Sequence, residues 1–295
     1  MRRRAPAATA LALALAGGSA LAAHGHSPAP PPAYHVAMHA APAAAARPLV
    51  AAHRGGALLW PENSLLAYRN ALALGVDYLE TDVHLTADGE IVILHDPTLE
   101  RTTTGRGAVR ASSLAALGQV RLKAADGTVT GERIPMLGEL LDLLAPSSAR
   151  LLLEIKAGAG REAYPGIEEK ALALVKARGL LDRVVVMAFE DDTVRRVRAL
   201  EPGVRTTLLV GRVRAERARA WPAEAVRWAT DAGATDLGIF FGLVDAGLVE
   251  AARAAGLRVA AWTVNEEADI RRVLDLGVDL VISDRPDVVT RVLGR

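Results

Sequence analysis

Short apolar runs recur along the chain from residue 48 onward, and stretches with helical periodicity separate most of them. The runs are rich in Val, Ile and Leu and are four to seven residues long. Such runs are typical of strands that are buried on both faces of a parallel sheet. We predict strands at 48–53, 78–84, 151–156, 184–189, 204–210, 236–241, 258–263 and 280–283.

The stretches between these runs have apolar residues at the spacing of amphipathic helices. Several are followed by a glycine, as expected where a helix ends in a left-handed residue; these are Gly75, Gly179, Gly256 and Gly277. Asn265 precedes two glutamates and is predicted to cap the next helix. The predicted helices are 64–74, 137–144, 167–177, 193–200, 215–229, 244–254, 267–276 and 286–293.

Eight strand–helix units in succession predict a closed (β/α)8 barrel, which is a TIM barrel of the α/β class. The predicted barrel domain spans residues 48–295, which is close to the size of about 250 residues that is usual for this fold. The sequence shows no internal repeat and no second domain.

One segment departs from the alternation of strands and helices. The strand at 78–84 is followed by Thr86-Ala87-Asp88-Gly89 and then by a second apolar run at 91–95. A turn of four residues can join only antiparallel neighbours, so a β-hairpin is predicted after the second strand. The Gly/Thr-rich segment 100–134 that follows lacks clear periodicity and is predicted to form a small excursion over the barrel mouth.

The register of this hairpin decides which side chains share a face. If Leu85 pairs with Glu90, then Glu80 lies opposite His95, and both side chains point to the same side as Asp82. A slip of one residue would move His95 to the other face.

The first 22 residues are typical of a signal peptide. Three arginines at positions 2–4 precede an apolar run at 5–16, and small residues end at Ala20-Leu21-Ala22. The apolar run is shorter than the roughly 20 residues that span a bilayer. We therefore expect cleavage after Ala22 and an exported protein, periplasmic or secreted, without stable membrane insertion. The alternative is a disordered Ala-rich start.

Residues 23–47 are rich in Pro, Ala and His and contain no acidic residue. This composition cannot form a core, so we expect a flexible linker between the signal peptide and the barrel domain.

The overall charge does not indicate a nucleic-acid partner. When the three leader arginines are removed from the 35 Lys and Arg residues, 32 remain against 34 Asp and Glu residues. Aromatic residues make up only 4% of the chain, too few for a surface that stacks bases. The absence of cysteine excludes a disulfide framework and a lipid-anchor cysteine.

Histidine is rare outside the linker. Four of the 7 histidines lie in the predicted linker, which leaves His53, His84 and His95. All three lie within a few residues of paired carboxylates, a pattern that favours proton transfer or phosphate contact. We expect His53 and His95 to form an acid/base pair, whereas His84 lies beyond the carboxylates and is predicted to be structural.

Carboxylates gather where the predicted strands end. In a TIM barrel the active site lies at the C-terminal ends of the strands. Glu80, Asp82 and Glu154 fall at such ends, and Glu62 lies on the loop after the first strand. Because carboxylates this close repel one another unless a cation lies among them, we expect an all-oxygen site for Mg²⁺ or Ca²⁺. The alternative is a set of separate salt bridges with Arg and Lys.

Cationic and aromatic side chains occupy similar positions. Arg54 and Lys156 are expected to bind an anion, and the planar guanidinium of Arg suits phosphate oxygens. Trp262, at the end of the seventh strand, is predicted to pack against the carbon skeleton of a substrate or within the barrel core.

Seven short strings occur in a fixed order between residues 49 and 290. They are His53-Arg54-Gly55, Pro61-Glu62-Asn63-Ser64, Glu80-Thr81-Asp82-Val83, His95-Asp96-Pro97-Thr98-Leu99, Glu154-Ile155-Lys156, Trp262-Thr263-Val264-Asn265 and Asp279 with Ser283-Asp284-Arg285-Pro286. Their order resembles that of glycerophosphodiester phosphodiesterases. The departures are Ser64, where Thr is usual, and a short 100–134 segment.

The resemblance implies metal-dependent hydrolysis of glycerophosphodiesters to glycerol 3-phosphate and an alcohol. It implies that one divalent cation, Ca²⁺ or Mg²⁺, is bound by Glu62, Glu80, Asp82 and Glu154. It also makes His53 and His95 the acid/base pair and Arg54 and Lys156 the phosphate contacts.

Two other functions are compatible with the residues. A phosphodiesterase of the lysophospholipase D type would need an apolar groove, for which Leu58-Leu59-Trp60 and Phe240-Phe241 are candidates. A non-catalytic protein that binds a phosphorylated polyol would be expected to lack an acid/base or metal residue, yet all are present.

Overall fold

The computed structural model describes residues 47–295. The predicted signal peptide, 1–22, and residues 23–46 of the predicted linker lie outside the described residues. Among the residues from 47 onward, no helix has both the length and the apolar character needed to cross a bilayer.

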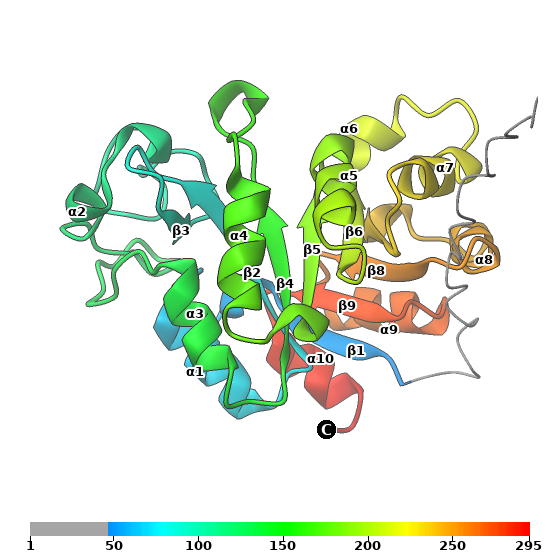
Figure 1. The fold of residues 1–295 in the computed structure, drawn as a ribbon. Helices are drawn as coiled ribbons and strands as arrows, with labels where there is room; N and C mark the ends of the chain where they lie inside the picture. Colours follow the sequence, from blue (N-terminus) through cyan, green and yellow to red (C-terminus); the bar gives the residue numbers. More distant parts are fainter. Residues whose placement is uncertain (1–46) are drawn as a thin grey trace, which may run out of the picture. The chain divides into compact units, whose positions relative to one another are not determined.

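Within residues 47–295, eight parallel strands form a closed barrel (Figure 1). Each strand pairs with its neighbour along the chain, and the first closes the ring because it pairs in parallel with both the second and the last. The predicted TIM barrel is therefore confirmed. The strands are β1 (Leu49–Ala52), β2 (Tyr78–Leu85), β4 (Arg150–Ile155), β5 (Val184–Ala188), β6 (Arg205–Val210), β7 (Asp236–Phe240), β8 (Arg258–Trp262) and β9 (Leu280–Ser283).

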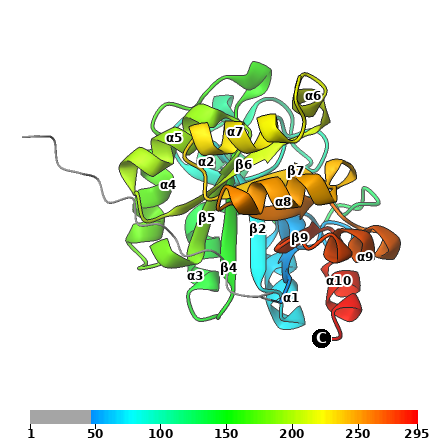
Figure 2. The same cartoon turned by 90° about the vertical axis from the view of Figure 1, so that its right-hand side faces the viewer.

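Helices surround the barrel (Figure 2). Ser64 caps the first of them, since its side chain accepts a hydrogen bond from the Ala67 amide. The predicted C-terminal glycines take left-handed backbone conformations, as Gly75 does at φ 79°. The helices are α1 (Leu65–Leu74), α3 (Leu137–Leu144), α4 (Ile167–Lys176), α5 (Asp191–Leu200), α6 (Arg212–Ala215), α7 (Ala223–Asp231), α8 (Ala246–Ala254), α9 (Glu267–Asp275) and α10 (Pro286–Val292).

Two predictions about the helices were wrong. Only the second half of the helix predicted at 215–229 forms, as α7, whereas α6 ends at Ala215. Pro222 is the N-cap of α7, and a helix does not continue through it because it lacks an amide donor and its ring would clash with a preceding helical turn. Asn265 does not cap α9, which begins after Glu266 without a side-chain cap. The Asn265 side chain instead donates a hydrogen bond to Asp284.

Strand alternation separates the interior of the barrel from the layer under the helices. Tyr78 and Leu152 belong to the cluster inside the barrel, whereas Leu79 and Leu151 pack in the larger cluster that includes the helices. Successive side chains on a strand point to opposite faces. Glu80 and Asp82 share the parity of Tyr78, and Glu154 shares that of Leu152. These three carboxylates therefore point into the barrel.

The hairpin after the second strand is present, but its predicted register was wrong by one residue. Strand β3 (Ile91–Ile93) pairs antiparallel with β2, and Leu85 lies opposite Ile91. The physical reason is the loop: the Thr86 amide donates to the Glu90 carbonyl, and Gly89 takes φ 79° between them. Thr86 and Glu90 thus close a three-residue loop instead of the predicted four-residue turn.

The corrected register pairs Val83 with Ile93, so the predicted position of Glu80 opposite His95 does not occur. Strand β3 ends at Ile93, two residues before His95. Alternation along β3 therefore does not determine the direction of the His95 side chain.

The predicted excursion after the hairpin is also present. It contains the short helix α2 (Leu114–Leu117) and lies beside β3 in Figure 1. Its own small core includes Leu99, Val109 and Leu122, and it packs on Val92 of β3. This core gives the segment a fixed shape although its sequence has no clear periodicity.

Candidate active site

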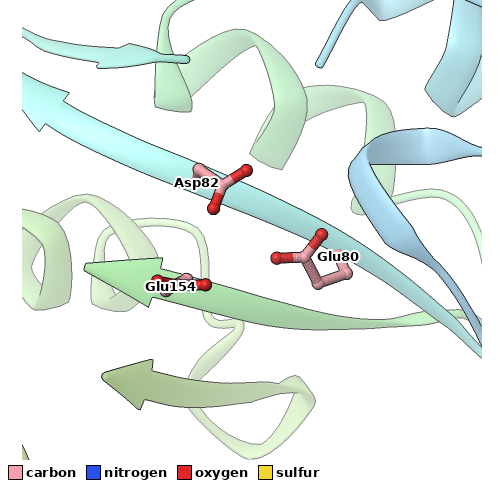
Figure 3. A group of neighbouring side chains, drawn as sticks. All are labelled: Glu80, Asp82 and Glu154. Atoms are coloured by element: carbon pink, nitrogen blue, oxygen red, sulfur yellow. The ribbon is translucent and has the colours of Figure 1, made fainter. Parts of the chain in front are cut away.

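Three buried carboxylates lie together on two adjacent strands of the barrel (Figure 3). Glu80 and Asp82 come from β2, and Glu154 comes from β4, where it is the direct parallel partner of Asp82. One oxygen of each carboxylate lies within 4.8 Å of the others. Their exposed fractions are 1%, 0% and 6%, so water does not screen the charges.

The electrostatics of this cluster fit a bound cation. Burial, together with the negative charge of Asp82, raises the pKa of Glu80. Burial also opposes ionisation of Asp82, but Lys156 and Arg54 outweigh it and hold its pKa well below the usual range. Glu80 Oε1 and Asp82 Oδ1 are buried and accept no hydrogen bond from any residue between 47 and 295. Buried oxygens that accept no hydrogen bond are suitable metal ligands.

Asn63 orients Asp82 from behind. Its Nδ2 donates to Asp82 Oδ2 at 3.0 Å. Its Oδ1 accepts from the Tyr68 hydroxyl at 2.7 Å, and that hydroxyl lies 2.6 Å from Thr81 Oγ1. All four residues are buried, so the network fixes the Asp82 carboxylate in a single orientation.

The His53-Arg54-Gly55 string forms a tight turn after β1. Arg54 takes a left-handed conformation at φ 51°, which directs its amide to Glu80 Oε2 at 2.7 Å. Gly55 follows at φ 82°, and a Cβ atom there would lie 2.7 Å from Ala67 Cβ. Only glycine fits this position, which explains the third residue of the string.

His53 is held by a carboxylate from the other end of the chain. Its Nδ1 lies 2.6 Å from Asp284 Oδ1, and because a carboxylate can only accept, Nδ1 carries the proton. Asp284 Oδ2 in turn accepts from Asn265 Nδ2 at 2.8 Å. This leaves His53 Nε2 facing the cluster, 4.0 Å from Glu80 Oε2. Burial lowers the pKa of His53, but Glu80 and Asp284 outweigh it and the net shift is upward.

His95 is held in the same way. Its Nδ1 lies 2.6 Å from Asp96 Oδ1, which again places the proton on Nδ1. Burial lowers the pKa of His95, and the positive charges of Lys156 and Arg54 add to the effect. The two histidines therefore have the same tautomer but opposite pKa shifts.

Lys156 and Arg54 place two cations beside the carboxylates. Lys156 Nζ lies 2.7 Å from Glu154 Oε1 and 3.4 Å from Asp82 Oδ1. Arg54 Nε lies 3.4 Å from Asp82 Oδ2. Burial lowers the pKa of Lys156, but Glu154 and Asp82 outweigh it and raise the pKa overall. Both side chains therefore remain charged.

Glu62 lies outside the cluster of three carboxylates, although we predicted it as a fourth ligand. Its Oε1 accepts from Arg54 Nη1 at 3.1 Å and from Arg101 Nη2 at 2.8 Å. Its Oε2 accepts from Arg101 Nη1 at 2.9 Å. Both oxygens are thus engaged by arginines.

A cavity opens beside the cluster. Charged and apolar side chains both line it, and Trp262 packs edge-on against Phe189. The cavity brings together the predicted residues His53, Arg54, Glu80, His95, Glu154, Lys156 and Trp262 with Met187, Phe189, Leu209, Thr263 and Ile282.

Sequence reasoning assigned no role to several residues that hold this site. Asn63 and Asp96 adjoin the predicted residues Glu62 and His95, and Asp284 adjoins a strand end. A reactive histidine usually binds a carboxylate through its second nitrogen, and this rule could have indicated Asp96 and Asp284. Arg101 had no such signal, because it lies in the segment without periodicity.

The sequence model of the Glycerophosphoryl diester phosphodiesterase family matches residues 53–288, which contain all of these site residues. This chain belongs to that family. A glycerophosphodiester phosphodiesterase of Caldanaerobacter subterraneus subsp. tengcongensis is 33% identical over 248 residues, which cover 84% of this chain and 98% of the relative. A glycerophosphodiester phosphodiesterase of Bacillus subtilis is 30% identical over 262 residues, which cover 83% of this chain and 86% of the relative.

Solved structures of the glycerophosphoryl diester phosphodiesterase family have the same fold. A putative member from Agrobacterium tumefaciens has a TM-score of 0.78 at 26% identity, covering 84% of this chain and 98% of that one. A phosphodiesterase from Oleispira antarctica, solved with the product sn-glycerol-3-phosphate, has a TM-score of 0.71 at 28% identity, covering 84% and 97%.

His84 supports the site without facing it, as predicted. It is fully buried, its Nε2 donates to the His95 carbonyl at 3.1 Å, and its Nδ1 accepts from the Tyr164 hydroxyl at 2.9 Å. Burial lowers the pKa of His84 to about 4. Below its ordinary value of 6.5, the unfolded chain therefore binds a proton that the folded protein does not.

We predict that His84 lowers stability as the pH falls from 6.5 to 4. Over this window the free energy of unfolding of the wild type should decrease by roughly 3 kcal/mol more than that of His84→Gln. Urea unfolding at several pH values measures both curves. If the two curves run parallel, His84 is not the group responsible.

Proposed function

We propose that this protein hydrolyses glycerophosphodiesters to sn-glycerol 3-phosphate and an alcohol, using one divalent cation, Ca²⁺ or Mg²⁺. The observation that carries the proposal is the buried cluster of Glu80, Asp82 and Glu154. Glu80 Oε1 and Asp82 Oδ1 accept no hydrogen bond from the described residues, and the adjoining cavity is lined by both His53 and His95. The names of the relatives and the product in the Oleispira antarctica structure support this substrate class.

Glu80, Asp82 and Glu154 would hold the cation. When bound, the cation would polarise the phosphoryl oxygens and offset the negative charge that develops on them. Oxygen-only ligands favour Ca²⁺ or Mg²⁺ over Zn²⁺. Arg54 and Lys156 line the same cavity and would bind the remaining phosphate oxygens.

His53 and His95 would carry out the proton transfers. Because Asp284 and Asp96 hold the two Nδ1 atoms, Nε2 is the reactive nitrogen of each ring. One histidine would take the proton from the attacking oxygen, and the other would give a proton to the leaving alcohol. The attacking oxygen would come from water or from the glycerol 2-hydroxyl, the latter through a cyclic phosphate. Trp262 would pack against the carbon skeleton of the substrate.

No specific observation favours the two other functions. Leu58 and Phe240 were candidates for an acyl groove, but neither is among the described residues that line the cavity. The predicted acid/base and metal residues are all present, which disfavours a non-catalytic binding protein.

The central test is release of sn-glycerol 3-phosphate from glycerophosphocholine by the full chain. We expect release to stop with EDTA and to return with Ca²⁺ or Mg²⁺, because the three carboxylates need a cation between them. Glu80→Ala should weaken cation binding in titration calorimetry, whereas Asp126→Ala, an exposed residue of the excursion, should not. Release that is unaffected by EDTA would contradict the metal-dependent reaction.

His53→Ala tests the acid/base pair. We expect turnover to fall by at least ~100-fold, since positioned proton transfer contributes roughly 10²–10⁴-fold. Circular dichroism checks that the variant is folded. A folded variant with turnover near that of the wild type would remove His53 from the mechanism.

We also propose that the protein is exported through a signal peptide at residues 1–22, to the periplasm or the medium. The basic start, the short apolar run and the small residues before Ala23 support this. When the full chain is expressed in a Gram-negative host, N-terminal sequencing of the exported protein should begin at Ala23. Recovery of only the uncleaved chain from the cytoplasm would contradict the proposal.

A further inference from the structure

The guanidinium of Arg101 joins two carboxylates at the edge of the active site. Arg101 Nε donates to Asp96 Oδ2 at 2.6 Å, and Nη2 donates to Asp96 Oδ1 at 3.0 Å. Nη1 and Nη2 donate to Glu62 Oε2 and Oε1 at 2.9 and 2.8 Å. All three nitrogens are therefore used, and each carboxylate is bound through both of its oxygens.

Each of these carboxylates also holds a residue of the proposed mechanism. Asp96 Oδ1 accepts from His95 Nδ1 at 2.6 Å. Glu62 Oε1 accepts from Arg54 Nη1 at 3.1 Å. Removing the guanidinium of Arg101 would thus release the supports of an acid/base residue and of a phosphate contact together.

The backbone around Arg101 is well anchored. The Thr103 hydroxyl and amide both donate to the Leu99 carbonyl, at 2.6 and 3.1 Å, and Leu99 is buried in the core of the excursion. The Lys123 amide donates to the Thr102 carbonyl at 2.8 Å. The excursion therefore presents the Arg101 side chain from a fixed position.

A contribution to global stability does not explain this arrangement. The Arg101 side chain is 47% exposed, and ion pairs in contact with water contribute little to folding. Its planar fork, however, fixes the orientation of both carboxylates, which a lysine ammonium cannot do. Arg101 is also not among the described residues that line the cavity, so its effect passes through Asp96 and Glu62.

We propose that Arg101 is a positioning residue of the active site, which orients His95 through Asp96 and Arg54 through Glu62. The inference rests on the proposed function of this site. It assigns the 100–134 excursion a part in catalysis, because the excursion core holds Arg101 in place.

The first test compares Arg101→Gln and Arg101→Lys with the wild type. We expect kcat for release of sn-glycerol 3-phosphate to fall about 10- to 100-fold in both variants, as it does for other residues that orient catalytic side chains. The melting temperature of both variants should remain unchanged. Arg121→Gln is the matched control, because Arg121 belongs to the same excursion and donates to the carbonyls of Gly118 and Val120. Activity of Arg101→Gln equal to that of Arg121→Gln would overturn the proposal.

The second test asks whether Arg101 acts through Asp96. In the Asp96→Asn background, Arg101→Gln should lower kcat much less than it does in the wild type, since the group that it orients is already altered. Millimolar guanidinium ion should restore part of the activity of Arg101→Ala. Fully additive effects together with no rescue would overturn the proposed route.

A third measurement does not depend on turnover. The ¹⁵N-bound proton at His95 Nδ1 should shift in the NMR spectrum of Arg101→Gln, because Asp96 loses its partner, whereas the signal of His53 Nδ1 should remain. An unchanged His95 signal would overturn the positioning role. An inactive wild type with the shifted His95 signal would instead retain the positioning role and contradict the proposed function.

Discussion

The site depends on the burial of three carboxylates that share one end of the barrel. Removing a carboxylate from water costs several kcal/mol unless charge or hydrogen bonds replace the water. Around Asp82 that replacement comes from Lys156, Arg54 and Asn63. Among residues 47–295, Glu80 accepts a hydrogen bond from the Arg54 amide alone, with His53 Nε2 4.0 Å away, and burial raises its pKa. The same desolvation that would destabilise an empty cluster therefore creates a strong preference for a cation within it.

The two histidines show how one arrangement is built from unrelated parts of the chain. Each imidazole donates a hydrogen bond from Nδ1 to a carboxylate, which leaves Nε2 available to the cavity. Asp96 is the neighbour of His95, whereas Asp284 lies 231 residues from His53 and reaches it only because β1 and β9 are adjacent. Closure of the barrel therefore does more than complete the sheet, since it brings the support of one histidine to the site.

Much of the fold was accessible from the sequence because it follows from periodicity. Buried parallel strands appear as apolar runs, and the alternation of side chains along β2 correctly directs Glu80 and Asp82 to one face. Predictions failed where one residue changes local geometry. Gly89 shortens the hairpin loop and shifts its register, and Pro222 is the N-cap of α7, which begins later than predicted. Asn265 has the sequence context of a helix cap, but the proximity of Asp284 gives its amide a different partner.

The sequence alone therefore determined the barrel and supplied the proposed site residues and the proposed cation class, because residue type and strand period are local properties. Only the tertiary structure decided which carboxylates meet. It placed Glu154 beside Asp82 and left Glu62 with Arg54 and Arg101. These outcomes depend on the register between strands and on a guanidinium from a segment without periodicity. Interactions between residues so far apart in the chain are set by packing, which no single stretch of sequence encodes.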